Sequence, residues 1–479
     1  MPADPQAPST LVRPADGGPA TYWLETLGCP KNRVDSDKLV GLLESDGYIP
    51  ARRPADADLL VVNTCAFIEE AREESIGVVL DLAGVRKRGA RLAVTGCMAE
   101  RYGQELADAL PEVDQVAGFG VPVHVSPRAQ ERERLSAGQP VRFASTRARP
   151  TGQPAAKRHR HSRDRVVPSF DLLNLPRPAA GAPWAYVKVA EGCDRHCGFC
   201  AIPSFRGAQR SRSATDILAE VDALGASEIV LVAQDLVSWD RDVTRPPRAR
   251  SGAARPEDIS GLVALVHAVR ERVERVRLLY LYPSGLSGAL VEAIGESGCP
   301  YFDLSLQHVS RPLLRRMRRF GDGERFLGKI AAIRRRFPDA ALRSSFIVGY
   351  PGETEEDHDC LLRFLDEAQL DWVGFFAFSP EVGTYALGLP GQVPGELVAE
   401  RLRECSEVQD AITASKRADL VGTTCRALID APGFARSHRE APEIDGLIRV
   451  PRQLPVGSWS ELEIIEAMGP DLGGVPVAA

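Results

Sequence analysis

Three cysteines, Cys193, Cys197 and Cys200, lie within eight residues in the stretch EGCDRHCGFCAIPSFRGAQR. A disulfide uses cysteines in pairs, and structural zinc takes four ligands, commonly as two short pairs well apart in sequence. Three thiols at spacings of four and three residues fit a four-iron, four-sulfur cluster, because cysteine thiolates bind such clusters. The fourth iron is then open, as in a catalytic metal site. A redox-active Cys-Gly-Phe-Cys pair or an unusual zinc loop is the alternative.

This spacing follows a predicted strand, and Phe199 stands just before the last cysteine. The pattern resembles the signature of the radical S-adenosylmethionine enzymes. The resemblance implies that the amino and carboxylate groups of S-adenosylmethionine bind the open iron. It also implies that an electron from the cluster splits the sulfonium and leaves a 5′-deoxyadenosyl radical.

Three further cysteines, Cys29, Cys65 and Cys97, end the strand-like runs TYWLETLGC, ADLLVVNTC and ARLAVTGC. Helix-like stretches separate these runs, and the intervals of 36 and 32 residues match βα units of a parallel sheet. Parallel strands place their carboxyl ends on one edge, so we expect the three thiols to converge there. They predict a second three-cysteine cluster, with separate buried structural cysteines as the alternative.

Around these cysteines the chain is similar to the methylthiotransferase family, which joins such a cluster domain to a radical S-adenosylmethionine domain. The family's three N-terminal cysteines correspond to Cys29, Cys65 and Cys97. The stretch TLGCPKNRVDS resembles the members of the RimO type, which modify an aspartate of a ribosomal protein. The tRNA-modifying members typically have Gln-Met-Asn after the first cysteine, where this chain has Pro30, Lys31 and Asn32.

Strand and helix signals alternate through residues 181–415 and predict a partial βα barrel of six strands, which would act at the carboxyl ends of those strands. By resemblance, the turn FIVGYPGET after the fifth strand helps to hold the nucleotide, through Gly349, Pro351 and Gly352. Gln234 ends the second strand, where we expect a nucleotide or substrate contact. An ordinary polar rim at the barrel mouth is the alternative for Gln234.

Length and composition place these parts in a globular protein. The chain has 479 residues, 44% of them hydrophobic, and a net charge of −6, which favours no general role as a nucleic-acid scaffold. We expect a soluble cytoplasmic protein, because no run is apolar enough to span a membrane and ten cysteines occur without a secretory signal. Four of these cysteines lack companions at ligand spacing: Cys299, Cys360, Cys405 and Cys425.

Two stretches carry concentrated positive charge. Residues 142–165 hold eight Lys or Arg against one acid, within a predicted flexible linker over residues 123–180. We interpret this linker as a solvated spacer, with an arm for ribosomal RNA as the alternative. The run RPLLRRMRRFGDGERF is basic at helical spacing, and a solvated helix face and a ribosome-facing surface are equally compatible with it.

Short β-like runs separated by Gly and Pro predict a small β-barrel over residues 416–479, after a first domain over residues 20–122. Its position and pattern are similar to the TRAM domain that ends methylthiotransferases. From Ala418 to the end, five Arg stand against nine Asp or Glu, a net charge of −4. Such a barrel suits a basic protein partner better than tRNA.

The resemblance implies an enzyme that adds a methylthio group to the β-carbon of an aspartate in small-subunit ribosomal protein S-twelve. Its cofactors would be two 4Fe-4S clusters and S-adenosylmethionine, and it would need an electron donor and a sulfur source. We expect the protein to act as a monomer. A tRNA adenosine methylthiotransferase is one alternative, and a non-catalytic iron-sulfur scaffold or redox sensor is another.

Overall fold

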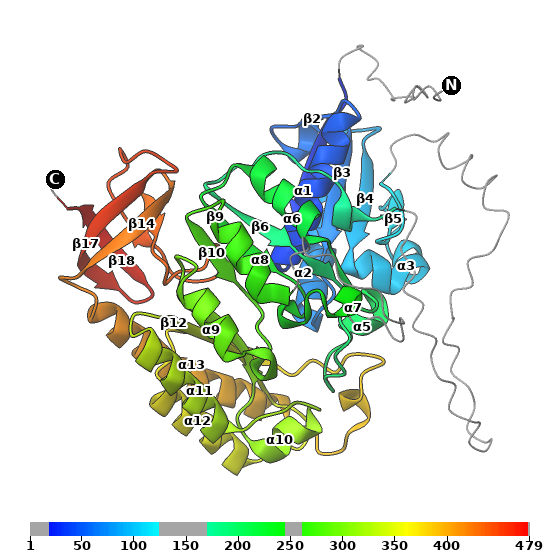
Figure 1. Cartoon of the computed structure of the whole chain (residues 1–479). Coiled ribbons are helices and arrows are strands. Elements are labelled where there is room, and N and C mark those ends of the chain that lie inside the picture. The colour runs from blue at the N-terminus through cyan, green and yellow to red at the C-terminus, as the bar shows by residue number, and fades with distance from the viewer. Residues whose placement is uncertain (1–18, 124–169, 245–260, 478–479) are drawn as a thin grey trace. The chain divides into compact units, whose positions relative to one another are not determined.

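The structure, a computed structural model, describes residues 19–123, 170–244 and 261–477 (Figure 1). The basic run at 142–165 therefore lies outside the described residues. The chain forms two compact units. Their ranges are Met1–Thr26, Leu42–Thr64 and Glu74–Asp171 for the first, and Leu27–Gly41, Cys65–Glu73 and Leu172–Ala479 for the second.

The first unit is built on a five-stranded sheet with the order β2-β1-β3-β4-β5, in which every pairing is parallel. Its strands are β1 (Thr21–Thr26), β2 (Ile49–Pro50), β3 (Leu59–Thr64), β4 (Arg91–Gly96) and β5 (Gln115–Ala117). Three helices follow strands of this sheet: α1 (Pro30–Ser45), α2 (Glu69–Val85) and α3 (Cys97–Ala109). Strand β3 is buried along its whole length, as a central parallel strand covered on both faces should be. The predicted strand–helix alternation is confirmed, and the edge strands β2 and β5 are additions to it.

The second unit contains six parallel strands in two sheets, β10-β9-β6 and β11-β12-β13. A parallel bridge between Leu281 and Leu304 joins the two sheets, which gives the order β6-β9-β10-β11-β12-β13. The strands are β6 (Trp184–Lys188), β9 (Glu228–Val232), β10 (Arg275–Leu278), β11 (Tyr301–Gln307), β12 (Ala341–Val348) and β13 (Trp372–Ala377). The predicted six-stranded partial barrel is confirmed.

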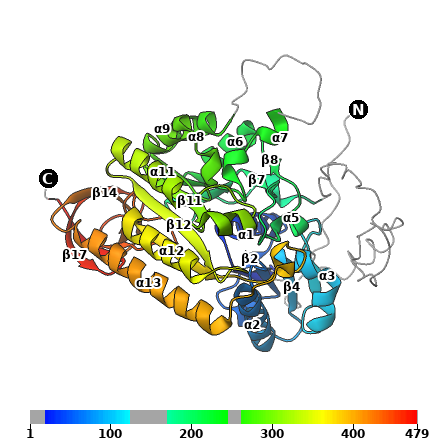
Figure 2. The same cartoon turned by 90° about the horizontal axis from the view of Figure 1, so that it is seen from below.

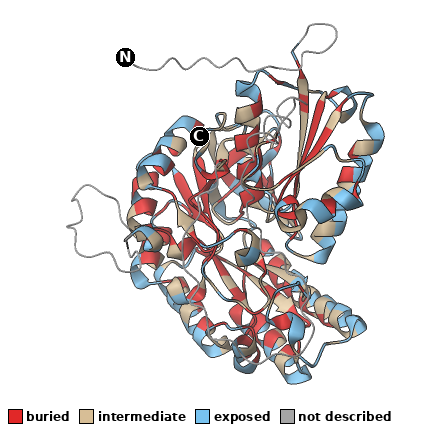
Figure 3. Cartoon of the chain, turned by 90° about the vertical axis from the view of Figure 1, so that its right-hand side faces the viewer, coloured by how far each residue is buried: buried red, intermediate tan, exposed pale blue. Residues whose placement is uncertain are grey.

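Helices cover the outside of this barrel (Figure 2). The helices of this unit that follow β6 are α5 (Ile202–Phe205), α6 (Ala214–Leu224), α7 (Arg241–Thr244), α8 (Gly261–Arg270), α9 (Gly288–Gly295), α10 (Arg311–Arg316), α11 (Gly323–Arg336), α12 (Glu355–Ala368) and α13 (Gly395–Ala418). Of these, the short α5 lies in the loop that carries Cys193, Cys197 and Cys200. Burial is concentrated on the strands, while the outer faces of the helices are exposed (Figure 3). Within the three described ranges, no helix is both long and apolar enough to cross a bilayer.

The chain ends in a closed five-stranded barrel, β14-β15-β16-β18-β17. Its strands are β14 (Thr424–Ala431), β15 (Phe434–Arg436), β16 (Ile448–Arg449), β17 (Trp459–Met468) and β18 (Asp471–Pro476). This confirms the predicted small β-barrel. Strand β18 carries a weak strand signal, because it contains two glycines and Gly is depleted in strands.

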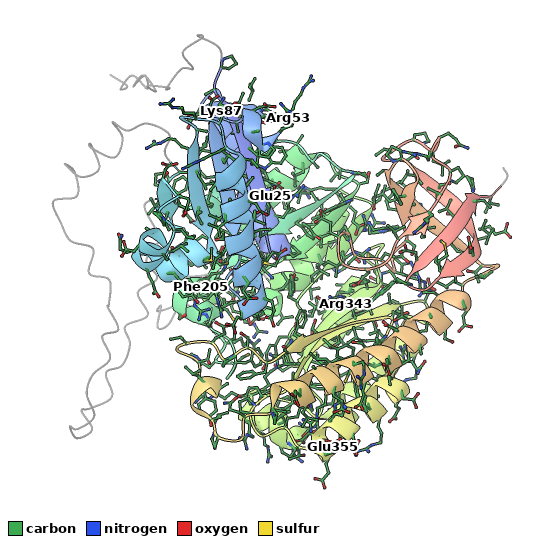
Figure 4. All side chains as sticks on the ribbon, turned by 180° about the vertical axis from the view of Figure 1, so that it is seen from behind. Glu25, Arg53, Lys87, Phe205, Arg343 and Glu355 are labelled. Carbon is green, nitrogen blue, oxygen red and sulfur yellow. The ribbon has the colours of Figure 1, made fainter. Side chains whose placement is uncertain are left out.

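The loop between β15 and β16 attaches this small barrel to the amino-terminal ends of the large-barrel strands. Tyr301 on β11 donates a hydrogen bond of 2.6 Å to Asp445, and Arg343 on β12 forms an ion pair with the same carboxylate. Arg343 is labelled in Figure 4 among the strands, whereas Glu355 projects outward from the start of α12. The last domain is therefore packed against the barrel by buried polar contacts.

Candidate functional site

Cys193, Cys197 and Cys200 lie on one loop at the carboxyl edge of the barrel. The loop lies between the short strands β7 (Ala190–Glu191) and β8 (Arg210–Ser211), which pair with each other after β6. Its base is fixed by a hydrogen bond from the Cys193 N–H to the carbonyl of Gly207, at 3.1 Å. The stretch predicted to bind a cluster is thus a closed loop at the barrel mouth, where barrels of this kind act.

Gly198 brings this loop close to the rest of the barrel. Its N–H donates to the carbonyl of Met317, and its carbonyl accepts from the N–H of Ala386, both at 2.8 Å. A Cβ at Gly198 would lie 2.8 Å from the Tyr350 hydroxyl. Only glycine therefore allows this approach between the loop and the barrel without a shift of its neighbours.

The three thiols have the chemistry that a cluster requires. Burial raises the pKa of Cys193 to about 11 and that of Cys200 to about 12, and the charge of Cys197 adds to both shifts. Holding Cys193 and Cys200 as thiolates therefore needs a bound cation nearby, and iron provides one. No three His, Cys, Asp or Glu side chains in the described ranges are grouped to hold one metal ion. A cluster takes each cysteine on a separate iron, so it does not require the three sulfurs to meet at one ion.

Two arginines and one aromatic ring border the thiols. Arg195 donates to Asp235 at 2.6 Å, and its guanidinium lies 3.9 Å from the centre of the Tyr282 ring. Arg319 lies 4.2 Å from the same ring centre and donates to the Cys197 sulfur at 3.4 Å. Two guanidinium groups therefore stack on one tyrosine ring beside the loop of Cys193, Cys197 and Cys200, which we call the cluster loop.

Glu191, two residues before Cys193, is the centre of a buried polar network. Its carboxylate accepts hydrogen bonds from Lys188 at 2.7 Å, and from Arg206 and Gln234 at 2.8 Å each. Lys188 also pairs with Asp35, and Arg206 donates to Asn32. This network fixes both ends of the cluster loop and ties the segment Leu27–Gly41 to them.

The end of β9 retains polar atoms suited to a ligand. Gln234 lies there as predicted, and its amide nitrogen is used by Glu191. Its carbonyl oxygen and one carboxylate oxygen of Asp235 are buried without a hydrogen-bond partner in the structure. Buried polar atoms are normally paired, so these two fit a polar ligand such as S-adenosylmethionine.

The other predicted cofactor residues have different surroundings. Phe199 is partly buried and packs against the barrel core. Gly349 and Gly352 have φ of +83° and +84°, and a Cβ there would meet Val398 at 2.4 Å and Arg316 at 2.5 Å. Pro351 is buried between them. These glycines are therefore required by close contacts with the chain's own side chains.

Cys29 and Cys65 are brought together by Gly28, which has φ of +89°. A Cβ at Gly28 would lie 2.7 Å from the Cβ of Cys65. Burial raises the pKa of Cys29, but the positive charges of Lys31 and Arg206, with backbone hydrogen bonds, outweigh it and lower the pKa overall. A thiol biased toward its thiolate is suited to bind iron.

Cys97 begins helix α3, directly after β4. In the first unit's sheet, Thr64 at the end of β3 pairs in register with Gly96 at the end of β4. Cys65 and Cys97 therefore each follow the last residue of neighbouring strands, which is the arrangement that the repeated intervals predict.

Comparison with family models matches three successive parts of the chain. Residues 21–118 match Uncharacterized protein family UPF0004, residues 187–365 match the Radical SAM superfamily, and residues 421–477 match the TRAM domain. The fold and the site thus define a radical S-adenosylmethionine enzyme with an additional N-terminal sheet domain and a C-terminal TRAM barrel.

Curated relatives narrow this class. The chain is 38% identical over 95% of its length to the ribosomal protein uS12 methylthiotransferase RimO of Saccharopolyspora erythraea, of which 94% is covered. It is 37% identical to the protein of the same name from Chloroflexus aurantiacus, over 95% of this chain and 99% of the relative. The chain belongs to this RimO family of radical S-adenosylmethionine methylthiotransferases.

Solved structures resemble the chain more distantly. The radical S-adenosylmethionine methyltransferase TsrM of Kitasatospora setae, with cobalamin and a [4Fe-4S] cluster bound, is 14% identical and has a TM-score of 0.47. The comparison covers 92% of this chain and 84% of TsrM.

Sequence reasoning missed Arg195, Arg319 and the network around Glu191. Arg319 belongs to the basic run that the sequence left undecided between a solvated face and a ribosome-facing surface. Arg311, Arg315 and Arg318 of that run are exposed, but Arg319 is only 9% exposed. Arg318 has φ of +55°, so the chain turns there and Arg319 does not continue the exposed helix face. The sequence carried only a weak signal of this turn.

Proposed function

We propose that this enzyme adds a methylthio group to the β-carbon of an aspartate in ribosomal protein uS12. Support comes from the near full-length likeness to relatives named for that substrate, together with a three-cysteine loop at the carboxyl edge of the barrel. The carbon to be modified carries a hydrogen that is hardly acidic, so acid–base catalysis by side chains cannot replace it with sulfur.

Cys193, Cys197 and Cys200 would hold the first cluster, and Gln234 with the turn at Gly349, Pro351 and Gly352 would hold S-adenosylmethionine beside Phe199. When bound, these cofactors supply cleavage of the sulfonium and removal of the substrate hydrogen atom. The chain's own part is to hold the loop with Cys193, Cys197 and Cys200 through Glu191, and to orient ligands at the polar end of β9.

Cys29, Cys65 and Cys97 would hold a second cluster that provides a site for the sulfur to be transferred. The close approach of Cys65 to Gly28 and the register at the ends of β3 and β4 support this assignment. An external electron donor and a sulfur source are needed in addition. We propose that the enzyme works in the cytoplasm as a monomer, with domains over residues 20–122, 181–415 and 416–479 and a linker over 123–180.

The small C-terminal barrel would help to dock the substrate. Its net charge of −4 from Ala418 onward complements a basic ribosomal protein, and such complementarity accelerates encounter. Glu461 and Glu463 on β17 are exposed and flank buried Leu462, so both carboxylates lie on the outer surface of the barrel. Any contact with ribosomal RNA would fall to the basic stretch at residues 142–165 rather than to this acidic barrel.

Anaerobic reconstitution followed by iron analysis tests the cofactor assignment. We expect about eight irons per chain, about four for each cluster. Replacing Cys193, Cys197 and Cys200 with Ala should abolish 5′-deoxyadenosine formation. The same change at the three N-terminal cysteines should leave that cleavage intact and stop methylthio transfer; about four irons in the unmodified protein would contradict the second cluster.

The substrate is tested by mass spectrometry of ribosomal proteins and of tRNA from cells that lack the protein. Loss of a methylthio group from an aspartate of uS12, restored by the intact gene but not by the gene encoding the Cys193, Cys197 and Cys200 variant, is the expected result. Loss of a methylthio group from tRNA, with uS12 unchanged, would establish the tRNA alternative instead.

A further inference from the structure

Arg319 is a buried cation without an acidic partner. Arg319 is 9% exposed, and no carboxylate in the described ranges forms an ion pair with it. By contrast, the neighbouring Arg195 is paired with Asp235. A buried charge without a counterion is costly, so Arg319 is arranged to face an anion that binds nearby.

Neutral groups of the chain hold Arg319 in place. One guanidinium nitrogen donates to the carbonyl of Ser305, the ring of Tyr282 lies against its face, and its Nε has no hydrogen-bond partner. The remaining donor reaches the Cys197 sulfur at 3.4 Å. The backbone hydrogen bond between Gly198 and Met317 fixes the cluster loop beside this arginine.

We propose that Arg319 is a positioning residue that donates a hydrogen bond to the Cys197 sulfur and, as an uncompensated cation, raises the reduction potential of the cluster at Cys193, Cys197 and Cys200. This inference rests on the proposed function, because it requires a cluster at these cysteines. Hydrogen bonds to the thiolate sulfurs, and charges near them, change the reduction potential of an iron-sulfur cluster.

The direction follows from electrostatics. Reduction transfers one electron from an external one-electron donor to the cluster and makes the cluster more negative by one charge. A fixed positive charge in contact with a cluster ligand therefore stabilises the reduced form more than the oxidised form. Because Arg319 is buried, solvent and salt screen this effect much less than they screen an exposed arginine.

The test measures the midpoint potential by redox titration monitored by electron paramagnetic resonance, without S-adenosylmethionine. The parent protein carries Cys29, Cys65 and Cys97 replaced by Ala, so that a single cluster is titrated. At the parent's midpoint potential, Arg319→Gln should lower the ratio of reduced to oxidised cluster at least about tenfold. For a one-electron couple, this corresponds to a midpoint potential lower by about 59 mV. Arg319→Lys keeps the charge but loses the planar fork, so it should shift the ratio less, in the same direction.

Arg318→Gln is the matched control, because it removes the same charge from the adjacent, exposed position. We expect its ratio to stay within about twofold of the parent. An unchanged potential in Arg319→Gln, or an equal shift in Arg318→Gln, would overturn the inference while leaving the proposed function intact. If the parent bound no cluster, the proposed function itself would fail. If both Arg319 variants bound no cluster, Arg319 would be an assembly residue and the tuning role would be wrong.

Discussion

Replacing Glu228 with Gln should destabilise the junction between the large barrel and the C-terminal barrel. Glu228 is the first residue of β9 and is fully buried. It accepts a hydrogen bond from Arg277 at 2.8 Å and one from Arg436 at 3.2 Å, and it forms an ion pair with Arg275 at 3.4 Å. Arg436 belongs to the C-terminal barrel, so one carboxylate joins the two parts.

The pKa of Glu228 sets the magnitude. Burial raises this pKa, but the charges of Arg436, Arg277 and Arg275 outweigh burial and lower it from 4.5 to about 2. A pKa change of one unit corresponds to about 1.4 kcal/mol, so this lowering of the pKa amounts to roughly 3 kcal/mol of folding stability at neutral pH. Loss of one partner from a buried ion pair has a cost of similar size, about 3–5 kcal/mol.

Because the folded-state pKa is lowered, this stabilisation is present above pH 4.5 and is lost as the pH falls toward about 2. Glu228→Gln should therefore have a lower free energy of unfolding than the unmodified protein at pH 7, and the difference should disappear near pH 2. Urea unfolding can be followed by tryptophan fluorescence, since Trp459 lies 4.6 Å from the Arg275 guanidinium.

Glu274→Gln is the control. Glu274 pairs with Arg426 across the same junction, but the two side chains are 48% and 53% exposed. Such a pair contributes below about 1 kcal/mol. Equal losses of stability in Glu228→Gln and Glu274→Gln at pH 7, or a Glu228→Gln difference that persists at the acid end, would refute the reasoning.

Three further predictions concern the site and the docking face. Gly198→Ala should lower the iron content per chain by about half, which is one cluster of two, because the added Cβ has no room. Gly288→Ala is the control and should keep the full iron content, because open space surrounds that position. Equal iron contents in the two variants would contradict this prediction. Gln234→Ala should weaken S-adenosylmethionine binding about fivefold in anaerobic calorimetry, the effect of roughly 1 kcal/mol for one hydrogen bond, and unchanged affinity would exclude the contact. Replacing Glu461 and Glu463 with Lys should slow association with the ribosomal protein about tenfold at low salt but not at high salt, with 5′-deoxyadenosine formation unaffected; a salt-independent effect would refute electrostatic docking.

The sequence alone was enough to predict the order of the elements and to single out the six cysteines as candidate cluster ligands. The spacing of Cys193, Cys197 and Cys200 is a local property, and so is the repeat that puts Cys29, Cys65 and Cys97 after strand-like runs. The alternation of strands and helices likewise predicted the parallel sheet, the six-stranded barrel and the small closing barrel, all of which the structure has.

Only the tertiary structure decided which charges act on these cysteines. Arg319 is separated from Cys197 by more than a hundred residues, and its run reads as an ordinary basic helix face, yet the turn at Arg318 directs it to the cluster loop. The segment Leu27–Gly41 joins the barrel unit through Asp35 and Lys188, although its sequence reads as part of the first sheet domain. Such contacts depend on packing between distant segments, which local periodicity and spacing do not encode.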